Sequence, residues 1–253
     1  MWEGNSVNNP IVPGTILTKF GVGEEVDSTT YKRLIGSLMY LTVTRPDVMY
    51  VVSLLSRFIA NPRKEHMMAA KRVLRYLKGT YNYGLIYERH SVNKLAAYTN
   101  NDYARDVEDQ RCTSGYICMF SKAAICWSSC KQEIVTLSST EAEYVVATSC
   151  ACHCVWLKGL LEDLGEKISG PLEVLCDNSS SIKLSKNPVM HRRTKHIDVR
   201  FHYLRDLVNQ DVVKLKFCKT EDQLADVMTK PIKLATFVQM REWMGVQEIK
   251  PEE

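Results

Sequence analysis

Apolar residues between positions 31 and 79 recur at helical spacing and predict three helices. The first spans residues 31–39, the second begins at the capping-box-like pair Thr44 and Asp47 and ends before Pro62, and the third ends at Gly79. The third helix carries an apolar stripe on one side and a basic face on the other, formed by Lys71, Arg75 and Lys78. We therefore predict a small helical subdomain over residues 28–90, preceded by a linker, residues 1–27, that shows no sustained period.

After about residue 84 the apolar spacing changes to two, which indicates strands. Strands are predicted over residues 95–99, 116–120 and 124–128, and the last two form a hairpin. A long helix begins at the capping box of Ser138 and Glu141 and ends at Gly165. The remaining elements are a strand over 172–176, helices over 180–185 and 197–208, a strand with Val213, Leu215 and Phe217 facing inward, and a short helix from Thr220 to before Pro231. This order predicts an α/β layer fold.

Three acidic residues lie at the ends of predicted elements. Asp177 directly follows the strand over 172–176, Glu143 lies in the first full turn of the long helix, and Asp226 lies in the last short helix among apolar residues. Ligands of open α/β sheets bind at the carboxyl ends of the strands. Each acid alone is most often a solvated charge, but together they suggest a site for a hard cation and phosphoryl chemistry.

Composition and charge limit the classes of protein. The chain has 253 residues, of which 45% are hydrophobic and 25% are charged, and this excludes a wholly disordered protein. It contains neither a run of eighteen apolar residues nor a basic-then-apolar N-terminus, so we expect an intracellular protein with no membrane partner. The net charge of +4 is too small to indicate nucleic-acid binding by itself. The basic face and a second cluster of Arg192, Arg193 and Lys195 either track phosphates or are solvated surface.

Nine cysteines without an export signal indicate thiols in a reducing compartment. The densest group is Cys150, Cys152 and Cys154, inside the long helix, where Cys150 and Cys154 share a face and Cys152 points away. Zinc sites favour other spacings, so the sequence favours a buried apolar role for this group over a metal site.

Longer segments resemble a known family. TLSSTEAEY at 136–144, LCDN at 175–178, RTKHID at 193–198 and TEDQLADVMTKP at 220–231 are similar to the ribonuclease H domain of copia-type LTR-retrotransposon Pol polyproteins. YTNNDY at 98–103 and TSGY at 113–116 fit the start of that domain. YKRLIGSLMY at 31–40, TRPD at 44–47 and AKRVLRYLKG at 70–79 resemble the thumb-and-connection end of the reverse transcriptase. The resemblance runs in order from about residue 10 to 232.

The resemblance implies a ribonuclease H-like mixed five-stranded sheet with flanking helices over residues 91–232, followed by a tail at 233–253. It also implies a four-carboxylate site that binds two Mg²⁺ ions and degrades the RNA of RNA/DNA hybrids. By motif, the carboxylates are Glu143, Asp177 and Asp226, and the fourth position is Asn100 instead of aspartate. Asn100 has no negative charge, and Asp102 is about 6.6 Å further along the strand. We therefore expect an impaired nuclease.

The resemblance also sets the partners and the alternatives. The chain lacks a Tyr-x-Asp-Asp motif, so no polymerase activity is expected from it. Its expected partners are RNA/DNA hybrid or other nucleic acid and the rest of the Pol polyprotein, in the cytoplasm or in a retrotransposon particle. The basic face and the cluster of Arg192, Arg193 and Lys195 are expected to contact phosphates. The alternatives are a non-catalytic nucleic-acid-binding remnant of the polyprotein and a pseudogene product with no cellular role.

Overall fold

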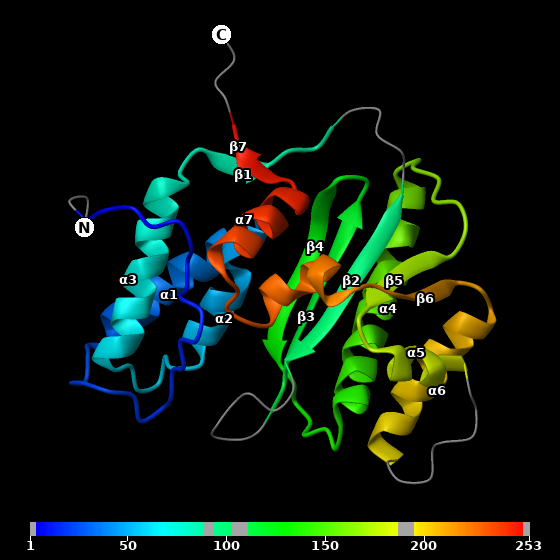
Figure 1. The fold of residues 1–253 in the computed structure, drawn as a ribbon, viewed down its shortest axis with the longest axis horizontal. Helices are drawn as coiled ribbons and strands as arrows, with labels where there is room; N and C mark the ends of the chain where they lie inside the picture. Colours follow the sequence, from blue (N-terminus) through cyan, green and yellow to red (C-terminus); the bar gives the residue numbers. More distant parts are fainter. Residues whose placement is uncertain (1–3, 89–93, 103–110, 187–194, 250–253) are drawn as a thin grey trace. The chain divides into compact units, whose positions relative to one another are not determined.

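A computed structural model describes residues 4–88, 94–102, 111–186 and 195–249, with the side chains of residues 195–201 left out. The chain divides into two compact units (Figure 1). Unit 1 comprises residues 1–87 and 230–253, and unit 2 comprises residues 88–229.

Unit 1 is a helical unit closed by a two-stranded sheet. Its elements are α1 (Ser28–Leu41), η1 (Pro46–Val48), α2 (Met49–Ser56), α3 (Lys64–Gly79), β1 (Tyr83–Leu85), α7 (Leu234–Trp243) and β7 (Val246–Glu248). Asp27 caps α1, because its carboxylate accepts hydrogen bonds from the backbone N–H groups of Thr29 and Thr30. The apolar stripe of α1 is buried, as its spacing predicts, and includes Tyr31 and Ile35.

The segment predicted to be a linker instead lies against α3. Arg75 Nε donates to the backbone oxygen of Asn5 at 2.6 Å, and Lys78 Nζ donates to that of Gly4 at 3.1 Å. Ile11 is buried. The segment predicted to be a tail also has regular structure, since α7 lies in it and β7 pairs antiparallel with β1. Both differences have one cause: these segments satisfy their backbone groups on partners distant in sequence, which a local period cannot indicate.

The predicted capping pair of Thr44 and Asp47 does not form. Asp47 is 3% exposed and accepts hydrogen bonds from Arg45 Nε at 2.9 Å and Arg45 Nη2 at 2.7 Å. Tyr76 donates its hydroxyl proton to Asp47 Oδ2 at 2.5 Å, and Arg45 Nη1 reaches the backbone oxygen of Thr80 at 3.0 Å. Arg45 and Asp47 therefore form a buried ion pair, and their hydrogen bonds to Thr80 and Tyr76 hold η1, which precedes α2, against α3.

Unit 2 contains a five-stranded mixed sheet with the order β4-β3-β2-β5-β6. Its strands are β2 (Leu95–Asp102), β3 (Thr113–Phe120), β4 (Ala123–Lys131), β5 (Leu172–Cys176) and β6 (Val213–Phe217). Strands β2, β3 and β4 form an antiparallel meander, and β5 and β6 continue it in parallel pairing with β2 and with each other. The five strands predicted from the sequence are all present, and the sheet is the mixed sheet that the resemblance implied.

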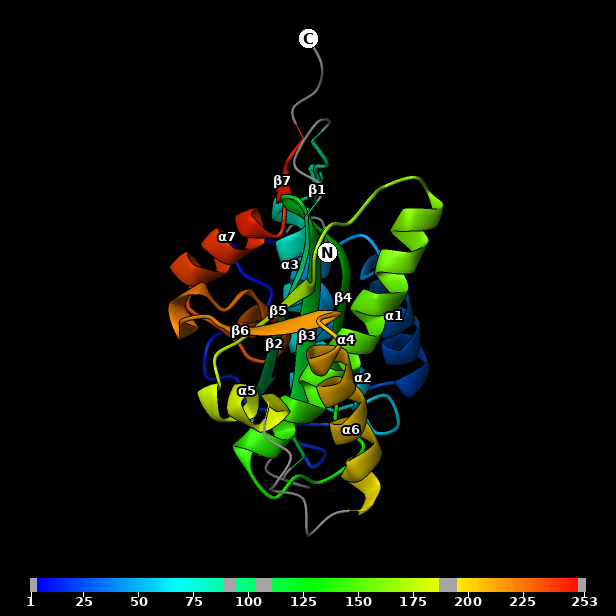
Figure 2. The same cartoon turned by 90° about the vertical axis from the view of Figure 1, so that its right-hand side faces the viewer.

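Helices cover the sheet of unit 2. They are α4 (Ser139–Asp163), α5 (Ser179–Lys186) and α6 (Lys195–Asn209), followed by two short 3₁₀ turns, η2 (Thr220–Asp222) and η3 (Leu224–Met228). Helices α4 and α6 lie on one face of the sheet (Figure 2), where Tyr144 and Leu204 join a core with Ala97 and Val174 of the strands. Ser138 caps α4 by accepting from the Glu141 N–H at 3.2 Å, as predicted.

Two local predictions in unit 2 are wrong. Phe217, predicted to face inward, is 57% exposed. It is the last residue of an edge strand and pairs with Cys176, the last residue of β5, so the sheet and its core end at this point. The predicted capping box at Thr220 is also absent, because Gln223 caps the following turn by accepting from the Ala225 N–H at 3.2 Å.

Helix α4 is the one element in the described residues that is long and apolar enough to cross a membrane, with a mean hydropathy of 1.3 over eighteen residues. Half of that window is buried inside the structure. Its apolar residues include Ala147 and Leu157, which lie in the core of unit 2. Packing against the sheet therefore accounts for the apolar composition of this helix.

Candidate carboxylate site

Asn100 lies near the end of β2 and is 4% exposed. Its side-chain amide nitrogen Nδ2 donates two hydrogen bonds, one to Asp226 Oδ1 at 2.5 Å and one to Thr229 Oγ1 at 2.8 Å. An amide nitrogen has two protons, so both donors are used. The position where the resemblance implies an aspartate is therefore occupied by a group that donates to the neighbouring carboxylate.

A glycine allows this contact to form. Gly115 of β3 is the cross-strand partner of Asn100, and η3 packs directly over it. A Cβ atom at position 115 would lie 2.5 Å from Met228 Cβ and 2.9 Å from Thr229 Cγ2. Only glycine leaves room for such an approach. The missing side chain at position 115 therefore allows Asp226 and Thr229 to contact Asn100.

Gln223 holds the same turn against β2. It is fully buried and donates from Nε2 to the backbone oxygen of Thr99 at 2.9 Å. Asp226 is 5% exposed, and its backbone oxygen accepts from the Thr229 N–H at 3.1 Å. Side chains alternate along a strand, so Asn100 and Ala97 point to opposite faces of β2. Ala97 lies in the core with α4, and the carboxylate of Asp226, which contacts Asn100, therefore lies on the face opposite to α4.

Glu143 approaches the end of β2 from α4. It is 5% exposed, and its Oε1 accepts a hydrogen bond from the backbone N–H of Asn101 at 2.9 Å. The last paired residues of β2 and β5 are Tyr98 and Leu175, so the Asn101 N–H lies beyond the end of that ladder. Gln132 supports the arrangement by donating to the backbone oxygen of Ala142 at 3.1 Å.

Asp177 follows β5 at the same level, two residues beyond Leu175, as Asn100 is two beyond Tyr98. The pKa values of two nearby thiols reflect the negative charges of these acids. Burial, with smaller contributions from the charges of Glu143 and Asp177, raises the pKa of Cys176 to about 11. Burial likewise raises the pKa of Cys218 to about 12, and this value includes smaller contributions from the charges of Asp177 and Asp226. The three acids that sequence analysis singled out therefore lie around one end of the sheet, together with Asn100.

The donor set fits a divalent cation only in part. Carboxylate oxygens are the ligands that Mg²⁺ prefers, and Glu143, Asp177 and Asp226 supply them. Asn100 instead directs N–H donors toward Asp226, where a cation needs lone pairs. Among the described residues, the one group of three His, Cys, Asp or Glu side chains whose ligand atoms all lie within 4.8 Å of one another is formed by cysteines, not by these acids. The acids are therefore spaced around the end of the sheet and are not gathered on a single point.

The predicted nucleic-acid-binding residues are only partly described. Lys71 is exposed on α3, whereas Arg75 and Lys78 contact the backbone of the N-terminal segment. Arg192 and Arg193 lie outside the described residues, and Lys195 begins α6 without a described side chain.

Sequence analysis missed three residues that shape the site. Thr229 accepts a hydrogen bond from Asn100, and Gln223 holds η3 against β2. Gly115 leaves the space in which η3 packs against β3. Gly115 lies in the TSGY segment and Thr229 follows Asp226 at the next turn, but neither spacing indicates a contact with β2. The signal that could have found Gly115 is its place inside a strand, where glycine often marks a close backbone approach.

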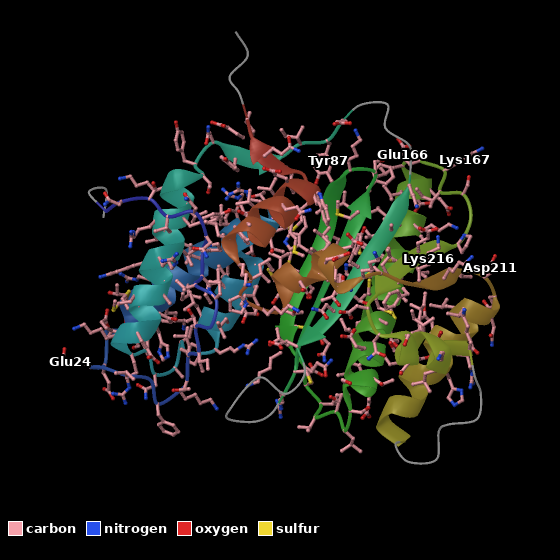
Figure 3. All side chains as sticks on the ribbon, in the orientation of Figure 1. Glu24, Tyr87, Glu166, Lys167, Asp211 and Lys216 are labelled. Atoms are coloured by element: carbon pink, nitrogen blue, oxygen red, sulfur yellow. The ribbon has the colours of Figure 1, made fainter. Side chains whose placement is uncertain are left out.

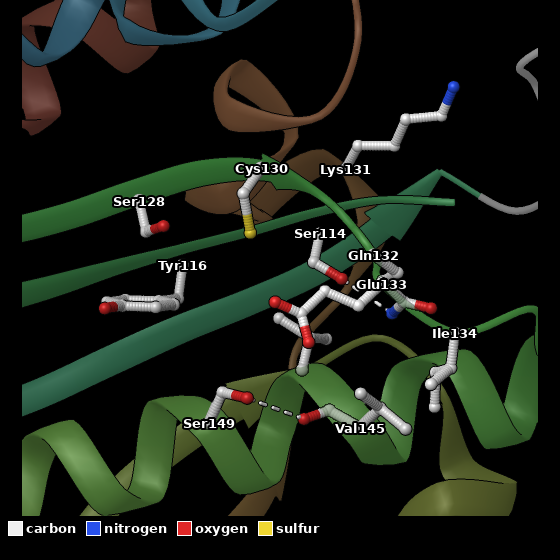
Figure 4. A pocket seen from close by; sticks show the side chains of 11 residues that line it. Ser114, Tyr116, Ser128, Cys130, Lys131, Gln132, Glu133, Ile134, Val145 and Ser149 are labelled. Atoms are coloured by element: carbon white, nitrogen blue, oxygen red, sulfur yellow. Dashed lines mark hydrogen bonds between the residues drawn. The ribbon is translucent and has the colours of Figure 1, made fainter. Parts of the chain in front are cut away.

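A separate cavity of about 290 Å³ lies between α4 and strands β3 and β4 (Figure 4). Tyr116, Cys130, Glu133 and Ser149 are among its lining residues, and Ser149 Oγ donates to the Val145 backbone oxygen at 3.2 Å. Glu143, Asp177 and Asp226 do not line it. The cavity is thus distinct from the carboxylate site.

The strand order and the strand directions define a ribonuclease H-like α/β fold. LC11-RNase H1, isolated from compost by a metagenomic approach, aligns with a TM-score of 0.41 and 16% identity over 55% of this chain and 94% of that chain. This TM-score is below 0.5, so the fold class rests on the strand order and strand directions of unit 2 and not on this alignment.

Sequence comparison identifies the family. The chain is 38% identical over 251 residues, 99% of its length, to the retrovirus-related Pol polyprotein from transposon RE1 of Arabidopsis thaliana. It is 42% identical over 217 residues, 85% of its length, to that from transposon TNT 1-94 of Nicotiana tabacum. The chain belongs to the family of Pol polyproteins of copia-type retrotransposons. It spans 17% and 16% of the length of these two relatives, and no family model matches it.

Proposed function

We propose that unit 2 is the hybrid-specific ribonuclease H domain of a copia-type Pol polyprotein, and that Asn100 impairs its hydrolysis of the RNA strand. The hydrogen bond from Asn100 Nδ2 to Asp226 Oδ1 carries this proposal. It supports the placement of position 100 among the carboxylates that the family uses. It also means that a neutral amide donor occupies a position where metal-dependent hydrolysis requires a carboxylate. The chain acts, on this proposal, as part of a longer Pol protein.

Glu143, Asp177 and Asp226 would hold the divalent cation. When bound, Mg²⁺ activates water for attack and offsets charge on the leaving oxygen of the RNA strand. The chain's own part is to present three carboxylates from α4, β5 and η3 at one sheet end. Asn100 removes one negative charge from that set and occupies an oxygen of Asp226. Loss of even an outer partner of a metal site costs about 10- to 100-fold in affinity or activity, so loss of a direct ligand is expected to cost at least that much.

Cleavage of a labelled RNA/DNA hybrid in Mg²⁺ tests the proposal. The parent chain is expected to cleave at least about 100-fold more slowly than its Asn100→Asp variant, and adding Asp177→Asn to that variant is expected to abolish the gain. Asn101→Asp is the matched control, because it adds the same charge one residue further along β2. Its side chain alternates to the other face of the strand, so it should restore no cleavage.

Two results would count against the proposal. Fast cleavage by the parent chain would show that a carboxylate at position 100 is unnecessary. Equal cleavage by the Asn100→Asp and Asn101→Asp variants would show that added charge, and not its position, matters.

A non-catalytic nucleic-acid-binding role is the second candidate. It is favoured by the same hydrogen bonds, since Asn100 satisfies Asp226 and Thr229 without any cation. Fluorescence anisotropy with a labelled hybrid distinguishes the two: binding that is unaffected by Mg²⁺ or EDTA, with no cleavage in the Asn100→Asp variant, supports binding alone. Lys71→Ala should weaken binding and reduce its salt dependence if the basic face tracks phosphates.

A further inference from the structure

Three cysteine side chains meet inside unit 2. Cys118 belongs to β3, whereas Cys150 and Cys154 lie one turn apart on α4. The sulfur atoms of Cys118 and Cys154 are 3.6 Å apart, those of Cys150 and Cys154 are 3.9 Å apart, and all three lie within 4.8 Å of one another. Each residue is at most 1% exposed. The sequence places two of these thiols on one helix face, but only packing against the sheet adds the third.

The sulfur spacing matches that of a thiolate metal site. An ion with metal–sulfur bonds of about 2.3 Å in tetrahedral coordination holds its sulfur atoms about 3.8 Å apart. Burial alone is also expected of cysteine as a small apolar residue. What distinguishes this group is that the sulfurs of two different elements contact one another, in a core that otherwise consists of aliphatic and aromatic side chains.

A fourth side chain lies next to the group. Cys126 of β4 is the cross-strand partner of Cys118 and is half-buried. His153 lies near Cys126 and lowers the pKa of its thiol. The ring of His153 is 5.6 Å from that of Tyr116 and 5.4 Å from that of Trp156, which is 58% exposed. Cys126 is the candidate for a fourth ligand, because it neighbours Cys118 on the adjacent strand.

We propose that Cys118, Cys150 and Cys154, with Cys126 as the fourth ligand, form a structural site for a soft, thiophilic divalent cation such as Zn²⁺. Thiolates select such ions, whereas the acids around Asn100 suit hard cations. The ion replaces the thiol protons, so it neutralises thiolates that would be costly to bury by themselves. The site joins α4 to β3 and therefore stabilises the fold of unit 2, independently of any nuclease activity.

Metal binding to the whole chain under reducing conditions, with Zn²⁺ and Co²⁺ as probes, tests this site. One Zn²⁺ per chain should remain after gel filtration, and Co²⁺ should produce the visible bands of tetrahedral thiolate coordination. X-ray absorption of the zinc-loaded chain should show sulfur ligands at about 2.3 Å. The double variant Cys118→Ala with Cys154→Ala should bind at least about 100-fold more weakly. Cys152→Ala is the matched control, because Cys152 lies on the same helix between two proposed ligands but is exposed.

The proposal is overturned if the double variant binds Zn²⁺ like the parent, if the parent binds none, or if the absorption spectrum shows only oxygen and nitrogen ligands. If the double variant fails to fold, the spectrum of the parent chain still decides, since sulfur ligands support the thiolate site and oxygen ligands place the ion among the acids. The parent spectrum requires no variant and no enzymatic activity, so its result does not depend on the proposed function.

Discussion

Asn100 Nδ2 lies 2.5 Å from Asp226 Oδ1, although the two residues are 126 positions apart in the chain. The contact joins β2 to η3 across the end of the sheet. In this arrangement the amide performs the stabilising role that a cation performs between two carboxylates: it places positive hydrogen atoms against an anionic oxygen. The buried hydrogen bond and the loss of negative charge are therefore two consequences of one residue, the asparagine at position 100.

Asn100→Asp should make the stability of unit 2 depend on Mg²⁺. Without metal, the new carboxylate faces Asp226 at hydrogen-bond distance, and two like charges so close destabilise the fold. The lost charge-assisted hydrogen bond alone is worth about 1.5–3 kcal/mol. Urea denaturation in EDTA should show a loss of at least that size, and added Mg²⁺ should recover part of it because it binds the folded state. Equal stability of this variant in EDTA and in Mg²⁺ would contradict the assignment.

Gly115→Ala should destabilise unit 2. The added Cβ would lie 2.5 Å from Met228 Cβ, so η3 must move away from β3, and overpacking of this kind costs about 1–3 kcal/mol. The displacement should also lengthen the contact between Asn100 and Asp226. Thermal unfolding measures the stability, and the amide resonances of Asn100 report the contact.

Gly159→Ala is the matched control for that substitution. Gly159 lies in α4, and a Cβ atom added there would meet no neighbouring atom within 4 Å, so alanine should be neutral or stabilise the helix by about 0.5–1 kcal/mol. If both substitutions have the same effect, close approach of η3 is not what position 115 provides.

Asp47→Asn should destabilise unit 1. Arg45 and Asp47 form a buried ion pair with side chains 7% and 0% exposed, so removal of one charge leaves the other uncompensated. Such a loss costs about 3–5 kcal/mol. By contrast, Glu25→Gln breaks an ion pair with Arg63 in which the glutamate side chain is 69% exposed, and this should change stability by less than about 1 kcal/mol. Chemical denaturation of both variants checks the ranking, and a larger loss in Glu25→Gln would refute it.

Glu173 should contribute to stability above acidic pH. Hydrogen bonds from Lys216 and then Lys94 lower the pKa of its carboxyl below the ordinary value (Figure 3 labels Lys216 on β6). Because the folded pKa is below the unfolded one, the contribution is present above the unfolded pKa of 4.5 and is lost as the pH falls through the folded pKa. Glu173→Gln should therefore lower the melting temperature at pH 6, and this difference from the parent should shrink as the pH falls below 4.5.

Melting profiles between pH 2 and 7 check this prediction. Glu133→Gln, at an exposed position on the same unit, is the control and should follow the parent across the range. A Glu173→Gln profile parallel to that of the parent at every pH would show that the two lysines do not act on this carboxyl.

Local patterns in the sequence determined a large part of this fold. The period of apolar residues is a property of neighbouring positions, and it placed all five strands of unit 2 and the helices that the structure contains between them. It also placed Glu143, Asp177 and Asp226 at element ends, and the motifs around them identified the family. The inward direction of Phe217 was wrong because alternation continues along a strand while the core does not.

Tertiary structure alone decided what the acids contact and which thiols meet. Strand pairing sets Asn100 opposite Gly115, and the missing side chain of Gly115 admits η3, so a contact across 126 positions depends on an atom that glycine lacks. In the same way, Cys118 joins the thiols of α4 only because that helix packs on β3. Distances between such residues are set by the packing of whole elements, and no period along the chain encodes them.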